Sequence, residues 1–260
     1  MDRRHFLLAV SAATVGAMGL TRWSTSGQQQ ATAATPVAVE PRPALLPPPP
    51  KEARVALPGG GVLSSLPGDD LLALTVDDGV NSDVVRLYTE FAKDTGVRLT
   101  YFVNGAYRSW TENRDLLRPL VDTGQIQLGN HTWSHPDLTK LPLTAVAEEL
   151  RHTHDFLWKS YGIDARPYFR PPYGAHNAHV DKISSELGYT ANTLWSGSLE
   201  DHVVIPADQI VRMAERYFTP GAIVIGHLNH EPVTHTYGRF VELIRERRLR
   251  TVTLKDVYIS

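Results

Sequence analysis

The chain has 260 residues, and 42% of them are hydrophobic, which is enough to bury one substantial core. Its 26 basic and 28 acidic residues give a formal net charge of −2, so it lacks the basic field that binds a nucleic-acid backbone. Cysteine is absent, which excludes disulfides, thiolate metal ligands, a cysteine nucleophile and a lipid-modified cysteine anchor. We expect one catalytic domain with no nucleic-acid partner.

The N-terminus has the pattern of an export signal. Arg3 and Arg4 precede a mildly apolar stretch from Leu8 to Leu20, which is typical of the twin-arginine route, and Ala31-Thr32-Ala33 offers a small-residue cleavage site. This stretch is shorter than the about 20 apolar residues that a membrane span needs. We predict a signal peptide over 1–33 and an extracellular or cell-wall-associated mature protein without a stable membrane span. An uncleaved N-terminal anchor is the alternative.

The next segment has the composition of a linker. Ser24–Pro50 is dominated by Gln, Ala, Thr and Pro and ends in four consecutive prolines, which favour extended geometry and bury no core. We predict a disordered tether there, with a short strand at Val62–Leu66. Residues 34–66 are thus a linker and lead-in, and 67–260 form the folded domain.

Within the folded domain, apolar runs of strand length alternate with segments of helical periodicity. The predicted strands are Leu71–Val76, Arg98–Val103, Ile126–Gly129, Tyr168–Arg170, Thr190–Trp195, Ala222–Gly226 and Arg250–Leu254. The predicted helices are Ser82–Asp94, Glu112–Thr123, Leu143–Tyr161, Ala178–Leu187, Ala207–Tyr217 and Gly238–Arg247. Alternation of this kind predicts an α/β fold, a distorted (β/α) barrel with about seven parallel strands. No glycine-rich dinucleotide motif opens a helix, which disfavours a doubly wound sheet.

Polar side chains follow five of these runs. In a parallel sheet the carboxyl ends of the strands meet at one rim, where the chemistry of such folds is found. The residues that we expect to meet there are Asp77, Asp78, His131, Arg170, Asp201 and His227.

Two of the segments predict a metal site. Asp77 and Asp78 are adjacent on an extended run, so they point to opposite sides, and one can bind metal while the other handles a proton. His131 and His135 are four residues apart, which places both imidazoles on one face of a helix or tight turn. One carboxylate and two imidazoles leave coordination positions open, and they suit zinc, with cobalt, nickel or manganese as alternatives. Read singly, Asp-Asp-Gly is a common acidic turn and the histidine pair a common structural feature.

Five segments, taken together in this order, resemble the motifs of polysaccharide deacetylases, the NodB-homology enzymes of carbohydrate esterase family 4. They are Thr75-Val76-Asp77-Asp78-Gly79, His131-Thr132-Trp133-Ser134-His135, Arg170-Pro171-Pro172-Tyr173-Gly174, Ser198-Leu199-Glu200-Asp201-His202 and Ile225-Gly226-His227. The resemblance covers Leu71 to Leu254, most of the predicted mature chain.

The resemblance implies a role for each residue of the rim. It implies that Asp78, His131 and His135 bind the metal and that Asp77 is the catalytic base. It implies further that Arg170 orients this base and that the main-chain N–H of Tyr173 helps to hold the oxyanion. His227 would be the general acid, with Asp201 as its partner.

The fourth motif departs from the family pattern. Ser198 stands where the family has its first aspartate, and His202 stands where it has a tryptophan that helps to wall the acetyl pocket. We expect these two differences to affect substrate preference more than catalysis. Val76, where phenylalanine is common, changes packing beneath the site.

The activity that the resemblance implies is hydrolysis of N-acetyl groups of an acetylated polysaccharide with N-acetylglucosamine units, such as peptidoglycan or chitin oligomers. Two alternatives stay open at this point. The protein could remove acetyl groups from oxygen, as xylan-directed members of the family do. It could also be a carbohydrate-binding relative whose groove binds glycan without turnover.

Overall fold

A computed structural model describes residues 44–59 and 61–259. The predicted signal peptide lies outside the described residues. All described residues belong to one compact unit. None of the helices in this part of the chain combines the length and the apolar character that crossing a bilayer demands.

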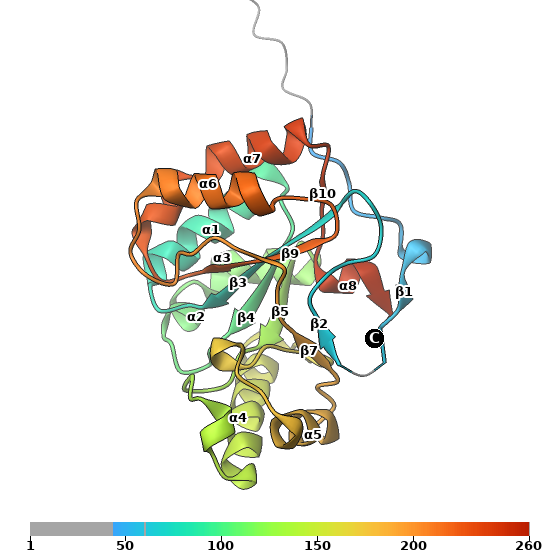
Figure 1. Ribbon diagram of the computed structural model, residues 1–260. Coiled ribbons are helices and arrows are strands. Elements are labelled where there is room, and N and C mark those ends of the chain that lie inside the picture. Colours follow the sequence, from blue (N-terminus) through green and yellow to red (C-terminus); the bar gives the residue numbers. More distant parts are fainter. Residues whose placement is uncertain (1–43, 60, 260) are drawn as a thin grey trace, which may run out of the picture. The chain divides into compact units, whose positions relative to one another are not determined.

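The unit is built on a parallel sheet of nine strands (Figure 1). Its order is β2-β7-β6-β5-β4-β3-β9-β8, and β10 pairs with the start of β3. The strands are β2 (Val62–Leu63), β3 (Leu71–Asp78), β4 (Leu99–Val103), β5 (Ile126–Asn130), β6 (Tyr168–Phe169), β7 (Ala191–Thr193), β8 (Gly197–Ser198), β9 (Ala222–His227) and β10 (Arg250–Thr251). The Leu66 amide donates to the carbonyl of Gly221 (2.8 Å) and so links the chain after edge strand β2 to the start of β9. The two ends of the order approach each other, and the sheet curls into the predicted distorted barrel.

Helices join successive strands. They are α1 (Ser82–Thr95), α2 (Ser109–Glu112), α3 (Arg114–Asp122), α4 (Leu143–Tyr161), α5 (Ala178–Glu186), α6 (Ala207–Tyr217), α7 (Tyr237–Glu246) and α8 (Leu254–Val257). Four 3-10 turns add η1 (Lys51–Ala53), η2 (Leu138–Lys140), η3 (Pro172–Gly174) and η4 (Glu231–His235). A second, two-stranded sheet pairs β1 (Val55–Ala56) with β11 (Tyr258–Ile259).

Some predicted elements differ from those in the structure. The helix predicted over Glu112–Thr123 is α3, which begins at Arg114, while Glu112 ends the short helix α2 that was not predicted. The strand predicted over Arg250–Leu254 stops at Thr251, because Thr253 and Asp256 form a capping box that starts α8. The two-residue strand β8 was not predicted, since a strand this short leaves no periodic signal.

The end of the predicted tether is packed against the domain, so that prediction was wrong for residues 44–50. Leu45 lies against the main hydrophobic cluster, and the carbonyl of Pro47 accepts a hydrogen bond from Arg250 (2.7 Å). The lead-in also contributes β1 and the edge strand β2. Composition predicted the extended geometry here, but tertiary contacts hold it in place.

Strand β3 is the centre of the sheet and carries the first motif at its end. All eight of its residues are buried, as expected for a strand covered on both faces. Its register sets Asp77 beside His227 of β9 and Asp78 beside Val103 of β4. The next helix begins at once, because the Asn81 side chain accepts hydrogen bonds from the first free amides of α1.

Candidate active site

A pocket of about 590 Å³ opens at the carboxyl ends of the strands. Six of the eight predicted site residues line it, namely Asp77, Asp78, His131, His135, Tyr173 and His227. The other two, Arg170 and Asp201, are buried and bond to residues that line the pocket. The structure therefore brings all eight together.

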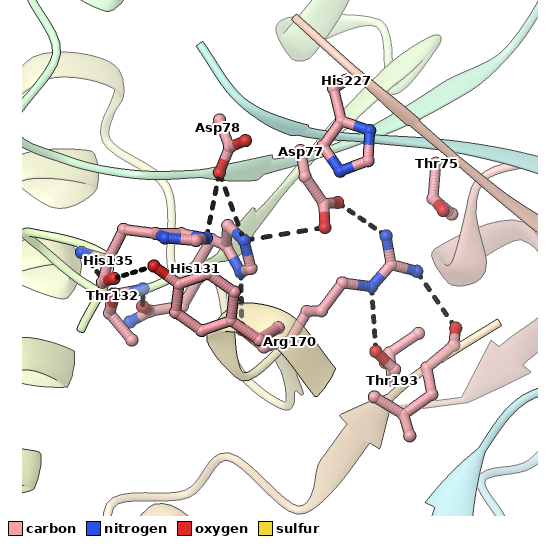
Figure 2. A network of polar contacts seen from close by, with 12 residues as sticks. Thr75, Asp77, Asp78, His131, Thr132, His135, Arg170, Thr193 and His227 are labelled. Atoms are coloured by element: carbon pink, nitrogen blue, oxygen red, sulfur yellow. Dashed lines mark hydrogen bonds and ion pairs between the residues drawn. The ribbon is translucent and has the colours of Figure 1, made fainter. Parts of the chain in front are cut away.

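The predicted metal ligands converge on one point (Figure 2). The Oδ1 atom of Asp78 lies 3.4 Å from Nε2 of His131 and 3.3 Å from Nε2 of His135. This oxygen is buried and has no hydrogen-bond partner among the described residues. A buried anionic oxygen is costly unless something pairs with it, and a divalent cation shared with two imidazoles fits this arrangement. Asp78, His131 and His135 thus form a candidate metal site.

The chain also fixes the orientation of the ligands. Nδ1 of His131 lies 2.7 Å from the carbonyl oxygen of Arg170, so this nitrogen carries the proton and donates it. In the neutral form of His131, Nε2 then carries the lone pair, on the side of Asp78. The second carboxylate oxygen of Asp78 accepts a hydrogen bond from Nδ2 of Asn229 (2.6 Å).

The surroundings shift the pKa values of the ligands. Burial raises the pKa of Asp78, but the two nearby imidazoles and the Asn229 hydrogen bond outweigh it and hold the pKa well below its usual range. For His135, burial together with the charge of His131 lowers the pKa. His135 is therefore favoured in the neutral form that ligates metal.

Left-handed backbone is concentrated at this site. Among the described residues, six that are not glycine have positive φ, and five of them belong to the motif segments. These five are Asp78, Thr132, His135, Tyr173 and Glu200, with φ between 59° and 75°. Such conformations cost free energy and cluster where function demands a particular side-chain direction. Gly79 has φ 101°, and a Cβ there would lie 2.5 Å from the Trp110 ring, so only glycine fits after Asp78.

Asp77 is held by a fully buried arginine. Nη1 of Arg170 donates to Oδ1 of Asp77 (2.6 Å), while Nε and Nη2 donate to the carbonyls of Thr193 (2.9 Å) and Leu194 (3.1 Å). The guanidinium also lies 4.2 Å from the centre of the Phe102 ring. Oδ2 of Asp77 remains 3.6 Å from Nε2 of His131. Asp77 is thus fixed next to the candidate metal site without belonging to it.

His227 has a carboxylate partner of its own. Its Nδ1 lies 2.9 Å from Oδ1 of Asp201, and its main-chain amide donates to Oδ2 of the same residue (3.1 Å). Burial lowers the pKa of His227. The hydrogen bond and charge of Asp201, together with the charges of Asp77 and Asp78, raise it by more, so the net shift of the pKa is upward. A protonated imidazole is favoured at this wall of the pocket.

Three further residues support the site and were missed by the sequence analysis. Glu149 of α4 accepts hydrogen bonds from the amides of Trp133 and Ser134 (2.8 and 2.7 Å) and so holds the loop between the two histidines. Asn130 accepts from the Thr132 amide (2.9 Å) at the start of that loop. Asn229, described above, follows His227 by two residues, and this closeness was the only sequence signal.

Comparison with known proteins agrees with this geometry. The family model for polysaccharide deacetylases matches residues 65–192. A 30.6 kDa protein of Geobacillus stearothermophilus, described as uncharacterized, is 30% identical over 75% of this chain and 73% of its own. The chain belongs to the polysaccharide deacetylase family, carbohydrate esterase family 4, which confirms the family that the sequence resembles.

Relatives with described activities match over part of their length. The peptidoglycan-N-acetylglucosamine deacetylase PgdA of Listeria monocytogenes is 30% identical over 72% of this chain and 38% of its own. The peptidoglycan-N-acetylmuramic acid deacetylase PdaA of Bacillus subtilis is 29% identical over 59% of this chain and 58% of its own. The chain therefore spans less than two thirds of either enzyme.

Solved structures share the fold. A structure described as T48 deacetylase with substrate has a TM-score of 0.64 and 28% identity, covering 72% of this chain and 90% of its own. BA3943 of Bacillus anthracis, described as a pseudoenzyme of carbohydrate esterase family 4, has a TM-score of 0.67 and 21% identity, covering 76% and 68%. The second likeness bears on the fold alone.

The buried pair of Arg170 and Asp77 gives a stability prediction. Replacing Arg170 by Gln should lower the free energy of unfolding by about 3–5 kcal/mol, because Asp77 is left as a buried charge without its partner. Urea unfolding measures the change. The matched control is Arg166→Gln, which breaks an exposed pair with Asp164 and should cost about 0–1 kcal/mol. Equal losses in the two variants would contradict the role given to Arg170.

Proposed function

We propose that the protein is a metal-dependent deacetylase that hydrolyses N-acetyl groups of a glycan with N-acetylglucosamine units. Water adds to the acetyl carbon, the carbon–nitrogen bond breaks, and acetate and a free amine are released. One observation carries the proposal. A three-ligand candidate metal site, an arginine-held carboxylate and a carboxylate-held imidazole share a single pocket.

Asp78, His131 and His135 would hold the metal. When bound, a divalent ion polarises the acetyl carbonyl and lowers the pKa of its water. Zinc is the proposed ion, with cobalt, nickel or manganese as alternatives, because one carboxylate and two imidazoles suit all four.

The remaining residues move protons and orient groups. Asp77 takes the proton of the attacking water, and the Arg170 guanidinium fixes the direction of the carboxylate. The main-chain N–H of Tyr173, on a backbone already in the left-handed conformation, would donate to the developing oxyanion. His227, whose Nδ1 is bonded to Asp201, has Nε2 available to protonate the departing nitrogen.

The relatives support an N-acetyl substrate. Two of them are described as peptidoglycan deacetylases acting on N-acetylglucosamine or N-acetylmuramic acid units. Residues of the types that the family motifs use for metal binding, base and acid chemistry surround one pocket here, which supports turnover over glycan binding alone. We further propose export by the twin-arginine route, on the pattern of residues 1–33.

Asp77→Asn tests the base. The variant should lose about 10²-fold or more in kcat, because a positioned proton acceptor contributes at least that much. It should still bind one metal ion, since Asp77 lies outside the candidate ligand set. The assay is acetate release from N-acetylglucosamine oligomers, with and without a chelator, after circular dichroism has confirmed folding.

The same assay separates the alternatives. Release from acetylated xylan, and not from the oligomers, would show an O-acetyl esterase. Glycan binding without acetate release by the metal-loaded wild type would show a non-catalytic relative. Full activity of the Asp77→Asn variant would contradict the role of Asp77.

Asp201→Asn tests the acid through its pH dependence. His227 acts as an acid only when protonated, so activity falls as the pH rises through its pKa. Asp201 raises that pKa, and the variant should therefore shift the alkaline limb of kcat/KM to lower pH. The control is Asp208→Asn, which removes an exposed carboxylate of α6 and should leave the profile unchanged. An unmoved alkaline limb in Asp201→Asn would contradict the assignment.

A further inference from the structure

One carboxylate on the pocket wall has no part in the chemistry described above. Glu200 lines the pocket, two residues after the end of strand β8 and directly before Asp201. Its backbone is left-handed (φ 59°), and its amide donates to Oγ of Ser198 (3.0 Å). The turn is therefore fixed, and the side chain is half-buried.

The charge of Glu200 is uncompensated. Within the described residues its carboxylate has neither an ion pair nor a hydrogen bond, unlike the carboxylates of Asp77, Asp78 and Asp201 beside it. No lysine or arginine in this part of the chain lines the pocket. Arg170 lies behind Asp77 and is fully buried. Glu200 is thus a lining carboxylate without a partner among the described residues, in a pocket wall that holds no lysine or arginine.

This charge distinguishes the two sugars of peptidoglycan, N-acetylglucosamine and N-acetylmuramic acid. An N-acetylglucosamine unit is neutral and has hydroxyls that can donate to a carboxylate. An N-acetylmuramic acid unit carries a lactyl carboxylate close to its acetamido group. Bringing that carboxylate close to Glu200 would place like charges together and remove water from both, and no lysine or arginine of the pocket wall would pair with either.

We propose that Glu200 is a specificity-determining residue through which the pocket selects neutral N-acetylhexosamine units and rejects units that carry a carboxylate. The inference rests on the proposed function and names the substrate class of the same site. It places the protein with deacetylases of N-acetylglucosamine units, rather than with those that act on N-acetylmuramic acid. Specificity here comes from a repulsive group on the enzyme.

The test compares matched substrates and matched variants. The substrates are an N-acetylglucosamine tetramer, a peptide-free peptidoglycan oligomer, and the same oligomer with its lactyl carboxylates converted to amides. Mass spectrometry locates the deacetylated unit. Wild type should deacetylate muramic units poorly, and both Glu200→Gln and amidation of the substrate should raise kcat/KM for these units by about tenfold, because each removes one of two like charges.

The variants also separate charge from shape. Glu200→Asp keeps the charge and accepts left-handed backbone, so it should preserve the discrimination. Glu186→Gln removes the same charge from an exposed position of α5 outside the pocket and should change nothing. High salt should weaken the discrimination in wild type and not in Glu200→Gln.

The outcomes distinguish failure of this inference from failure of the proposed function. Equal kcat/KM of wild type for the two sugars, or no effect of Glu200→Gln, would overturn the role of Glu200 while the function stands. Absence of acetate from every glycan would overturn the function. In that case calorimetry measures the binding of the peptide-free oligomer and of its amidated form. We expect the wild type to bind the amidated form more tightly and Glu200→Gln to lose this preference.

Discussion

The arrangement of the site depends on how one buried carboxylate oxygen is satisfied. Oδ1 of Asp78 has no hydrogen-bond donor within the described residues, and it faces the Nε2 atoms of His131 and His135 at 3.4 and 3.3 Å. An anionic oxygen in this position costs free energy unless a cation pairs with it. The neighbouring contacts fix this geometry. Asn229 donates a hydrogen bond to the second oxygen of Asp78, and left-handed backbone at Asp78 and His135 directs both side chains to one point.

Arg170 couples the candidate metal site to the proposed base. Its carbonyl oxygen accepts from Nδ1 of His131 and sets the orientation of that ligand, while its guanidinium holds Asp77. The first contact follows from strand register. Phe169 at the end of β6 is paired with Asn130 at the end of β5, so the residues that come next, Arg170 and His131, are neighbours too. The same rule sets Asp77 beside His227 on the other side of β3. A parallel sheet thus assembles groups that are up to 150 residues apart.

The sequence predicted the helices and strands that have a regular apolar pattern, and the polar residues that follow such strands. All seven predicted strands are present and α4 has the predicted bounds, both of which followed from apolar periodicity. Polar residues at strand ends and the spacing of His131 and His135 indicated seven of the site residues, and the family resemblance alone implied Tyr173. Glu149 could not be predicted, because acidic residues are common on amphipathic helices and only the fold brings this one to the histidine loop. The packing of residues 44–50 was missed for a similar reason, since Leu45 lines one hollow with Ile244 and Leu249 and Pro47 bonds to Arg250, all distant in sequence. Tertiary contacts, not local preference, decide such positions.

Calorimetric titration of the protein with zinc, after a chelator has removed bound metal, tests whether Asp78, His131 and His135 bind a cation. We expect one ion per chain for the wild type, and loss of that binding in Asp78→Asn, which keeps the shape of the side chain and tolerates left-handed backbone. Binding of no ion by the folded wild type, or equally tight binding by Asp78→Asn, would contradict it.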